Sequence, residues 1–159
     1  RKKRYINKVN NQLQVKISQN LDAFYPILVE NKTRHQVQPT HTLEELKILQ
    51  EKFPDRIKLL LTYERDKIIG GTLNFITNYA TCIIFYNMIL YEYVNLQPAS
   101  FQIYKTIEWA KKQNFKFIDL GVSQKKDEKS KISPHESLIH FKEQFGAIGM
   151  IRKVIRLKL

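Results

Sequence analysis

The sequence predicts a mixed α/β domain, in which helices cover both faces of a mostly antiparallel sheet. Three strand-like runs, 57–63, 68–76 and 81–90, follow one another with short polar turns between them, which predicts an antiparallel meander. A helical pattern over 98–113 then leads into an apolar run over 115–121. Because a helix joins them, the third meander strand and this run should lie parallel if they are neighbours, and we expect them to splay apart and form a cleft.

The residues before the meander predict one strand and two helices. Apolar and polar residues alternate over 13–17, as in a half-buried strand, and apolar residues recur at helical spacing over 20–31. Pro26 removes one backbone donor from that helix and should bend it. A second helix should begin after Thr42, because Glu45 three residues later completes a capping box.

The C-terminal quarter predicts a loop, a helix and a strand. Residues 123–132 are polar and rich in lysine. Residues 133–136 read Ser-Pro-His-Glu, a second capping box with Pro134 at the favoured first helical position. The helix should end at Gly146, and basic residues alternate with apolar ones over 148–159, which predicts a last strand.

Composition indicates one globular domain. The chain has 159 residues, 43% of them hydrophobic, and at this size roughly 70% of the unfolded surface can be buried without disulfides or a structural metal. We expect a single domain over 1–159, with 1–12 as a basic segment or linker. Cys82 stands alone in an apolar run, so we interpret it as a small buried side chain. No stretch approaches the ~20 apolar residues of a membrane span, and we expect a cytoplasmic protein.

The charge predicts phosphorylated partners. Lys and Arg number 27 against 15 Asp and Glu, a net charge of +12. Residues 1–4 are an unbroken basic run, and Arg152, Lys153, Arg156 and Lys158 crowd the other end. The pattern fits RNA, a nucleotide-linked substrate or coenzyme A, although a basic surface can also be only a solvated one.

Three segments carry a family resemblance. They read FPDRIKLLLTYERDKIIGGTLNF over 53–75, KTIEWAKKQNFKFIDLGVS over 105–123 and HESLIHFKEQFGAIG over 135–149. In this order, with a strand ending in Asp-x-Gly and a helix reading Phe-Lys-x-x-Phe-Gly, they resemble the acyltransferase domain of FemAB-like proteins, a branch of the GNAT superfamily. The resemblance implies a GNAT fold from about Leu13 to Leu159. It also implies a chain that is the C-terminal half of a tandem protein or a single-domain relative, with a preceding GNAT domain as a possible partner.

The same resemblance implies a reaction. An amine on a cell-wall precursor or an amino sugar would attack an acyl or aminoacyl group carried by acyl-CoA or by aminoacyl-tRNA, without a covalent enzyme intermediate. Coenzyme A enzymes of the wider superfamily usually have a glycine in the loop before the crossover helix, whereas residues 90–100 contain none. This departure weakens the coenzyme A alternative. A rival hypothesis keeps the fold but not the chemistry, as a basic module that binds tRNA, nucleotide-sugar or a partner domain.

Lys142 is the most informative charged residue. Helical geometry places it beside Leu138, Ile139 and Phe145, so it interrupts an apolar stripe. It could bind phosphate or stabilise an oxyanion, or its stem could pack while its ammonium reaches water. The resemblance favours function, because it maps the donor-site Phe-Lys pair of similar enzymes onto Phe141 and Lys142.

The remaining candidates follow the strands and the first helix. Asp119 lies near the carboxyl end of an apolar strand, where it could orient an amine or simply accept backbone N–H groups. Tyr86 could donate a proton to the leaving group or be a core residue. The resemblance implies that the third meander strand, with Tyr86 and Asn87, faces the acyl donor, and that Arg34 and His35 contact the acceptor, although these two could also be ordinary surface residues. Altogether we predict Lys142 and Tyr86 as catalytic residues, and as substrate-binding residues Arg34, His35, Asn87, Asp119, Ser123 and Phe141.

No metal site is predicted. His135-Glu136 followed by His140 resembles a metalloprotease motif, but the two histidines are five residues apart and diverge by about 140° around a helix. His35 and His41 have no cysteine or carboxylate cluster at ligand spacing.

Overall fold

The computed structural model describes residues 6, 9, 11–126, 132–151 and 157. Contacts divide the chain into two compact units, Arg1–Gly121 and Val122–Leu159, and each is described by itself. Both terminal basic runs lie outside the described residues. So does most of the predicted last strand, of which 148–151 have no regular structure. No helix in the described part of the chain has both the length and the apolar composition that a membrane crossing needs.

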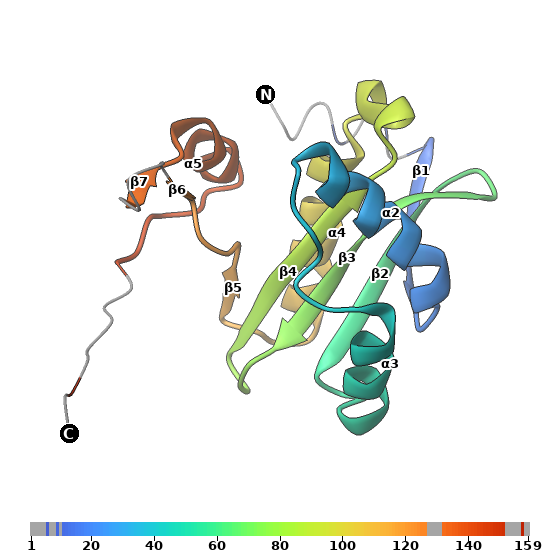
Figure 1. The fold of residues 1–159 in the computed structure, drawn as a ribbon, viewed down its shortest axis with the longest axis horizontal. Helices are drawn as coiled ribbons and strands as arrows, with labels where there is room; N and C mark the ends of the chain where they lie inside the picture. The colour runs from blue at the N-terminus through green and yellow to red at the C-terminus, as the bar shows by residue number, and fades with distance from the viewer. Residues whose placement is uncertain (1–5, 7–8, 10, 127–131, 152–156, 158–159) are drawn as a thin grey trace. The chain divides into compact units, whose positions relative to one another are not determined.

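The first unit is built on a five-stranded sheet with the order β1-β2-β3-β4-β5 (Figure 1). The first four strands are antiparallel neighbours, whereas β4 and β5 are parallel, which confirms the predicted mixed sheet. The strands are β1 Leu13–Ser18, β2 Ile57–Glu64, β3 Lys67–Ile76, β4 Thr81–Ile89 and β5 Phe117–Asp119.

Helices cover both faces of this sheet. Helices α2 (Leu21–Arg34) and α3 (Leu43–Lys52) pack on one face, where their apolar side chains join those of β2, β3 and β4 in the larger core cluster. Helix α4 (Pro98–Lys112) packs on the other face, where the Thr72 and Thr106 hydroxyls meet at 3.0 Å (Figure 1). The sandwich of helices around a sheet buries the apolar face of each element.

Local sequence signals explain the helix starts. At α3 the predicted capping box is confirmed: the Glu45 N–H donates to the Thr42 hydroxyl at 3.2 Å, and the Thr42 N–H donates to the Glu45 carboxylate at 2.7 Å. Pro98 begins α4, as predicted. Between β4 and α4 lies a short 3₁₀ helix, η1 (Tyr91–Leu96), and Gln97 then adopts a left-handed conformation with φ +39°.

A β-bulge in β4 marks the point where this strand leaves β5. Leu73 pairs with Tyr86 and Asn74 with Ile84, so Phe85 is the extra residue. The parallel pairs run only from Thr81↔Phe117 to Ile83↔Asp119, just before the bulge, while β4 continues to Ile89. The predicted parallel pair is therefore confirmed, and in Figure 1 the two strands diverge beyond their short contact.

Asn31 joins α2 to the unpaired end of β4. The Leu90 N–H donates to Ile69 of β3, so by strand alternation the Ile89 backbone faces away from β3. The Ile89 N–H donates to Asn31 Oδ1 at 3.2 Å, and Asn31 Nδ2 donates to the Ile89 carbonyl and to the Ile27 carbonyl. Asn31 is 6% exposed. A buried side chain thus supplies the hydrogen bonds that a neighbouring strand would otherwise make.

Strand β5 is shorter and more open than the sequence predicts. The apolar run over 115–121 predicts a strand covered on both faces, but β5 has three residues and Phe117 is 65% exposed. The strand ends because Asp119 Oδ1 accepts the Gly121 N–H at 2.6 Å and Gly121 turns the chain with φ +73°. The apolar residue Phe115 belongs to the preceding turn and packs against Trp109.

The second unit corrects the prediction for the lysine-rich loop. It contains two short antiparallel strands, β6 (Gln124–Lys126) and β7 (Ile132–Pro134), and the helix α5 (Glu136–Glu143). The prediction of a second capping box is wrong, because pairing with β6 holds Ser133 and Pro134 in extended structure. The N-cap of α5 is instead His135, whose side chain makes no capping hydrogen bond. Helix α5 also ends three residues before Gly146, whose φ is +81°.

Replacing Asn31 by Leu tests the hydrogen bonds that Asn31 makes to the backbone of Ile89 at the end of β4. The volume is nearly kept, but the Ile89 N–H and carbonyl lose their buried partners, so we expect a loss of about 1–3 kcal/mol in the free energy of unfolding. Urea unfolding followed by circular dichroism measures it. Asn31→Asp, which keeps an acceptor but places a carboxylate against two carbonyls, should cost more than Asn31→Leu. Equal stability of the unchanged protein and both variants would contradict the stabilising role assigned to the Asn31 hydrogen bonds.

Candidate functional site

The free edge of β4 beyond the bulge is the centre of the candidate site. Because Ile89 directs its backbone groups away from β3, Asn87, two residues earlier, directs its N–H and carbonyl to the same edge. Among the described residues no strand pairs with this part of the edge. The Asn87 side chain donates to the Ala99 carbonyl at 3.2 Å, and its Oδ1 is buried without a hydrogen-bond partner in the described structure. Asn87, a predicted substrate-binding residue, thus offers an acceptor and a backbone edge.

Tyr86 lies in the core next to the bulge. Its side chain is 2% exposed and belongs to the larger core cluster. The phenol oxygen accepts the Thr40 N–H at 3.1 Å and lies 3.3 Å from His41 Nδ1. This geometry favours the core interpretation of Tyr86 over direct proton donation, and it turns attention to the histidine that Tyr86 contacts.

His41 is the residue that sequence reasoning missed. Its imidazole is half-buried and packs against Phe85, the bulge residue, with ring centroids 5.4 Å apart, and against Phe75 at 6.1 Å. The His41 carbonyl accepts the Tyr25 hydroxyl at 3.3 Å, and the next residue is the N-cap of α3. These contacts fix both the backbone and the imidazole ring of His41. The sequence offered one clue, the fixed position of His41 before a capping box, and nothing that linked it to β4.

Arg34 and His35 lie at the C-terminal end of α2, beside the end of β4. The Arg34 guanidinium lies over the Tyr91 ring at 4.0 Å, and His35 Nε2 is 3.4 Å from the Tyr91 hydroxyl. Both side chains are exposed, and Tyr91 is the first residue of η1. The structure thus brings these two predicted residues together at the connection between β4 and α4.

The connection between β4 and α4 turns the chain without a glycine. Gln97 takes the left-handed conformation, and its carbonyl accepts the N–H groups of Ser100 and Phe101 in the first turn of α4. The helix start carries partial positive charge, which favours anions such as phosphate. The chain thus turns without glycine, but Pro98 has no N–H and the N–H groups of Ser100 and Phe101 already bond to Gln97, so these three residues do not form the backbone cradle that a glycine-containing loop can offer to a pyrophosphate.

Asp119 and Cys82 lie where β4 and β5 are paired. Asp119 is the last paired residue of β5, and its carboxylate accepts the Gly121 N–H, which matches the structural interpretation of this residue. Burial raises the pKa of the Cys82 thiol to about 12, so the thiol is neutral at physiological pH and a poor nucleophile. A role for Asp119 in orienting an amine stays a prediction.

The second unit holds the other predicted residues. Lys142 Nζ donates to the Val122 carbonyl at 3.0 Å and to the Ser123 hydroxyl at 2.8 Å. Phe141 packs edge-to-face on Phe145 with centroids 5.4 Å apart. Lys142 and Ser123 are thus brought together, and the ammonium ties α5 to the segment before β6. Roles for these residues in donor binding stay predictions. Within the described residues, no group of three or more His, Cys, Asp or Glu side chains could hold a metal ion.

Comparisons with known proteins identify the fold. No family model matches the sequence, and no curated protein matches it either. Solved structures do match. An aminoglycoside acetyltransferase from an uncultured soil metagenomic sample, in complex with sisomicin, superposes with a TM-score of 0.65 at 12% identity, over 94% of this chain and 99% of that one.

Two further acetyltransferases extend the likeness. The aminoglycoside N-acetyltransferase AAC(6')-Iy in complex with CoA gives a TM-score of 0.60 at 12% identity, over 92% of this chain and 94% of its own. The ribosomal-protein-alanine N-acetyltransferase of Brucella melitensis biovar Abortus 2308 gives 0.62 at 11% identity, over 92% and 99%. The chain has the fold of GNAT acetyltransferases. At these identities the likeness shows the fold and leaves the reaction to be argued from the site.

Lys142→Met tests the hydrogen bonds of the second unit. The substitution keeps an apolar stem but removes the ammonium, so the bonds to Val122 and Ser123 are lost, and we expect faster amide hydrogen exchange over α5, equivalent to about 1–3 kcal/mol. Ser123→Ala should show part of this effect, and the double variant should show less than the sum of the two. Unchanged exchange together with a tenfold or greater loss of turnover would instead indicate a role in donor binding.

Proposed function

We propose that this chain is an N-acyltransferase that moves an acyl group from coenzyme A to an amine. The observation that carries the proposal is the free backbone edge of β4 after the bulge at Phe85, where pairing with β5 has ended at Ile83. An edge of this kind can hydrogen-bond an extended, amide-bearing arm in the manner of an added strand. Likeness to acetyltransferase folds supports the reaction class.

The chain's own groups fit an acyl-CoA donor in three places. The backbone of Asn87 would pair with the amide-bearing arm, and the positive end of the α4 dipole would attract the phosphates, with Arg34 and His35 adding hydrogen-bond donors nearby. When bound, acyl-CoA supplies an activated thioester. A backbone N–H of the β4 edge would stabilise negative charge on the acyl oxygen as the amine attacks.

His41 is the proposed general base. When Nδ1 carries the hydrogen and donates to the Tyr86 oxygen, Nε2 keeps a lone pair that can accept a proton from the attacking amine. A bond forms between the amine nitrogen and the acyl carbon, the carbon–sulfur bond breaks, and the sulfur leaves with the electron pair. The thiolate takes up a proton from water, and the imidazolium returns its proton to the hydroxide that remains. Tyr86 acts as a positioning residue, because its phenol fixes the imidazole from a buried position.

The resemblance to FemAB-like proteins supplies an alternative donor and acceptor. A FemAB-like chain would accept an aminoacyl group from aminoacyl-tRNA, act on a cell-wall precursor or an amino sugar, and pair with a preceding GNAT domain. The net charge of +12 supports a phosphorylated donor of either kind, and equally a non-catalytic module that binds one. The identity of the acyl donor and the role of His41 as general base therefore need separate tests.

Thermal stability with different ligands separates the donors. We expect acetyl-CoA to raise the melting temperature of the full chain by mass action, with only a modest loss of binding when salt is raised to physiological strength. Aminoacyl-tRNA bound through many phosphates would lose affinity steeply over the same range. Stabilisation by tRNA and not by acetyl-CoA would move the proposal to an aminoacyl donor, and stabilisation by neither would refute it.

His41→Gln tests the base. The variant should retain the acetyl-CoA-induced rise in melting temperature while kcat for transfer to a panel of amines falls by about 10²- to 10⁴-fold. Tyr86→Phe should lower kcat less and change the pH profile, as expected of a positioning residue. His140→Gln, at a histidine with a 78% exposed side chain, serves as the matched control. Unchanged turnover in His41→Gln, with normal donor binding, would remove His41 from the mechanism but leave acyl transfer standing.

A further inference from the structure

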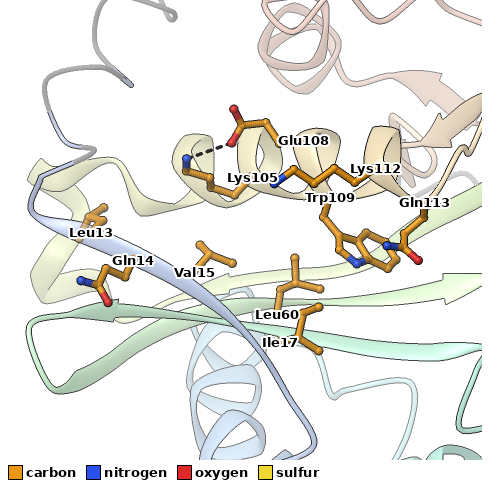
Figure 2. Close-up of a pocket in the computed structure, with 10 residues that line it drawn as sticks. All are labelled: Leu13, Gln14, Val15, Ile17, Leu60, Lys105, Glu108, Trp109, Lys112 and Gln113. Atoms are coloured by element: carbon orange, nitrogen blue, oxygen red, sulfur yellow. Dashed lines mark hydrogen bonds and ion pairs between the residues drawn. The ribbon is translucent and has the colours of Figure 1, made fainter.

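The first unit has a second concave feature, on the α4 face of the sheet and at its opposite edge. A groove of about 600 Å³ runs between the inner face of β1 and the flank of α4 (Figure 2). Val15, Ile17, Leu60 and Trp109 are among its apolar lining residues, and Lys105 and Lys112 are among its polar ones. In Figure 2 the indole of Trp109 points from the helix toward Leu60 and Ile17, while Val15 points up toward the helix. The groove therefore has an apolar floor and a polar wall.

Strand β1 presents an open edge beside this groove. It pairs with β2 through all six of its residues without a bulge, and no strand among the described residues pairs with its other side. In an antiparallel edge strand every second residue directs its N–H and carbonyl outward. Proteins usually protect such edges with proline, a bulge or an outward charge. Here the central Lys16 is exposed, but its side chain lies over the Tyr63 ring on the other sheet face, so the face toward the groove carries no charge from β1, and Ile17 there is 64% exposed.

The wall of the groove is cationic. Lys105 pairs with Glu108 at 2.9 Å, which leaves its charge largely balanced. Lys112 has no ion pair among the described residues, so the groove carries an excess positive charge, on a chain whose net charge is +12. That charge disfavours a second copy of the same chain as the occupant, because two such chains repel each other, and it favours an acidic one.

We infer that β1 and this groove bind an extended acidic peptide segment, which adds a strand to the sheet. The backbone of the peptide would pair with the outward groups of β1, and its alternate apolar side chains would lie over Val15, Ile17 and Trp109. Its carboxylates would meet Lys112. The occupant is thus a segment in which acidic and apolar residues alternate. The inference does not depend on acyl transfer, because the groove and the β4 edge lie at opposite edges of the sheet.

Trp109 gives this inference a direct readout, because it is the single tryptophan of the chain. We expect a blocked peptide of about eight residues, in which Val alternates with Glu, to change the fluorescence of the full chain in a saturable way. The same peptide N-methylated at the alternate amides that would face β1 should bind at least about tenfold more weakly, equivalent to about 1.4 kcal/mol. Equal binding of the two peptides would show that charge alone attracts them and would overturn strand addition.

Matched variants locate the site. Ile17→Asp should weaken peptide binding by about tenfold or more, since it puts a carboxylate on the apolar floor, whereas Ile48→Asp, at another exposed isoleucine, should not. Lys112→Glu should weaken binding more than Lys111→Glu, its neighbour outside the groove. Equal effects within either pair would refute the site. So would sedimentation showing that the chain dimerises through β1, because the occupant would then be a second copy.

Discussion

The arrangement of the first unit depends on how β4 satisfies its backbone hydrogen bonds after it leaves β5. Parallel pairing ends at Ile83, yet β4 continues to Ile89, and buried N–H and carbonyl groups without partners are costly. At the C-terminal end of β4, the Asn31 side chain hydrogen-bonds both the N–H and the carbonyl of Ile89, so these two groups are not left without partners. Because Asn31 lies on α2, the same bonds fix that helix against the strand. The stretch between Ile83 and Ile89 keeps a free edge, which is the one proposed to pair with the acyl donor.

The bulge at Phe85 links this edge to the histidine. An extra residue in β4 allows Phe85 and Tyr86 to lie together beside His41, where one ring packs against the imidazole and one hydroxyl holds its Nδ1. A regular strand would place consecutive side chains on opposite faces. The irregularity that follows the end of pairing with β5 therefore also brings together the groups proposed for catalysis, so that the free edge and the proposed base lie near the same part of β4.

Periodicity predicted the strands and helices of the first unit, because each has an apolar face that the fold buries, as Leu46 of α3 and Leu73 of β3 show. Periodicity failed where tertiary contacts or backbone pairing determine the local structure. Ser133 matches a capping pattern as well as Thr42 does, but pairing with β6 removes it from the helix. His41 was missed because its partners, Phe85 and Tyr86, are more than 40 positions away in the sequence and meet it only through a bulge. That bulge leaves no mark in the apolar pattern of 81–90.

Two glycines explain how helices on opposite faces can both reach the end of β4. A Cβ on Gly70 would lie 2.5 Å from the Met88 carbonyl oxygen and would also collide with the Gln102 amide of α4. A Cβ on Gly71 would lie 2.7 Å from the Leu60 carbonyl oxygen and 3.3 Å from Phe24 of α2. Central strand β3 is therefore thin where α4 and α2 approach it. Since α4 supplies the partner of Asn87 and α2 supplies Asn31, both anchors of the β4 edge require this thinness, which gives the Gly-Gly pair of the 53–75 segment a physical reason.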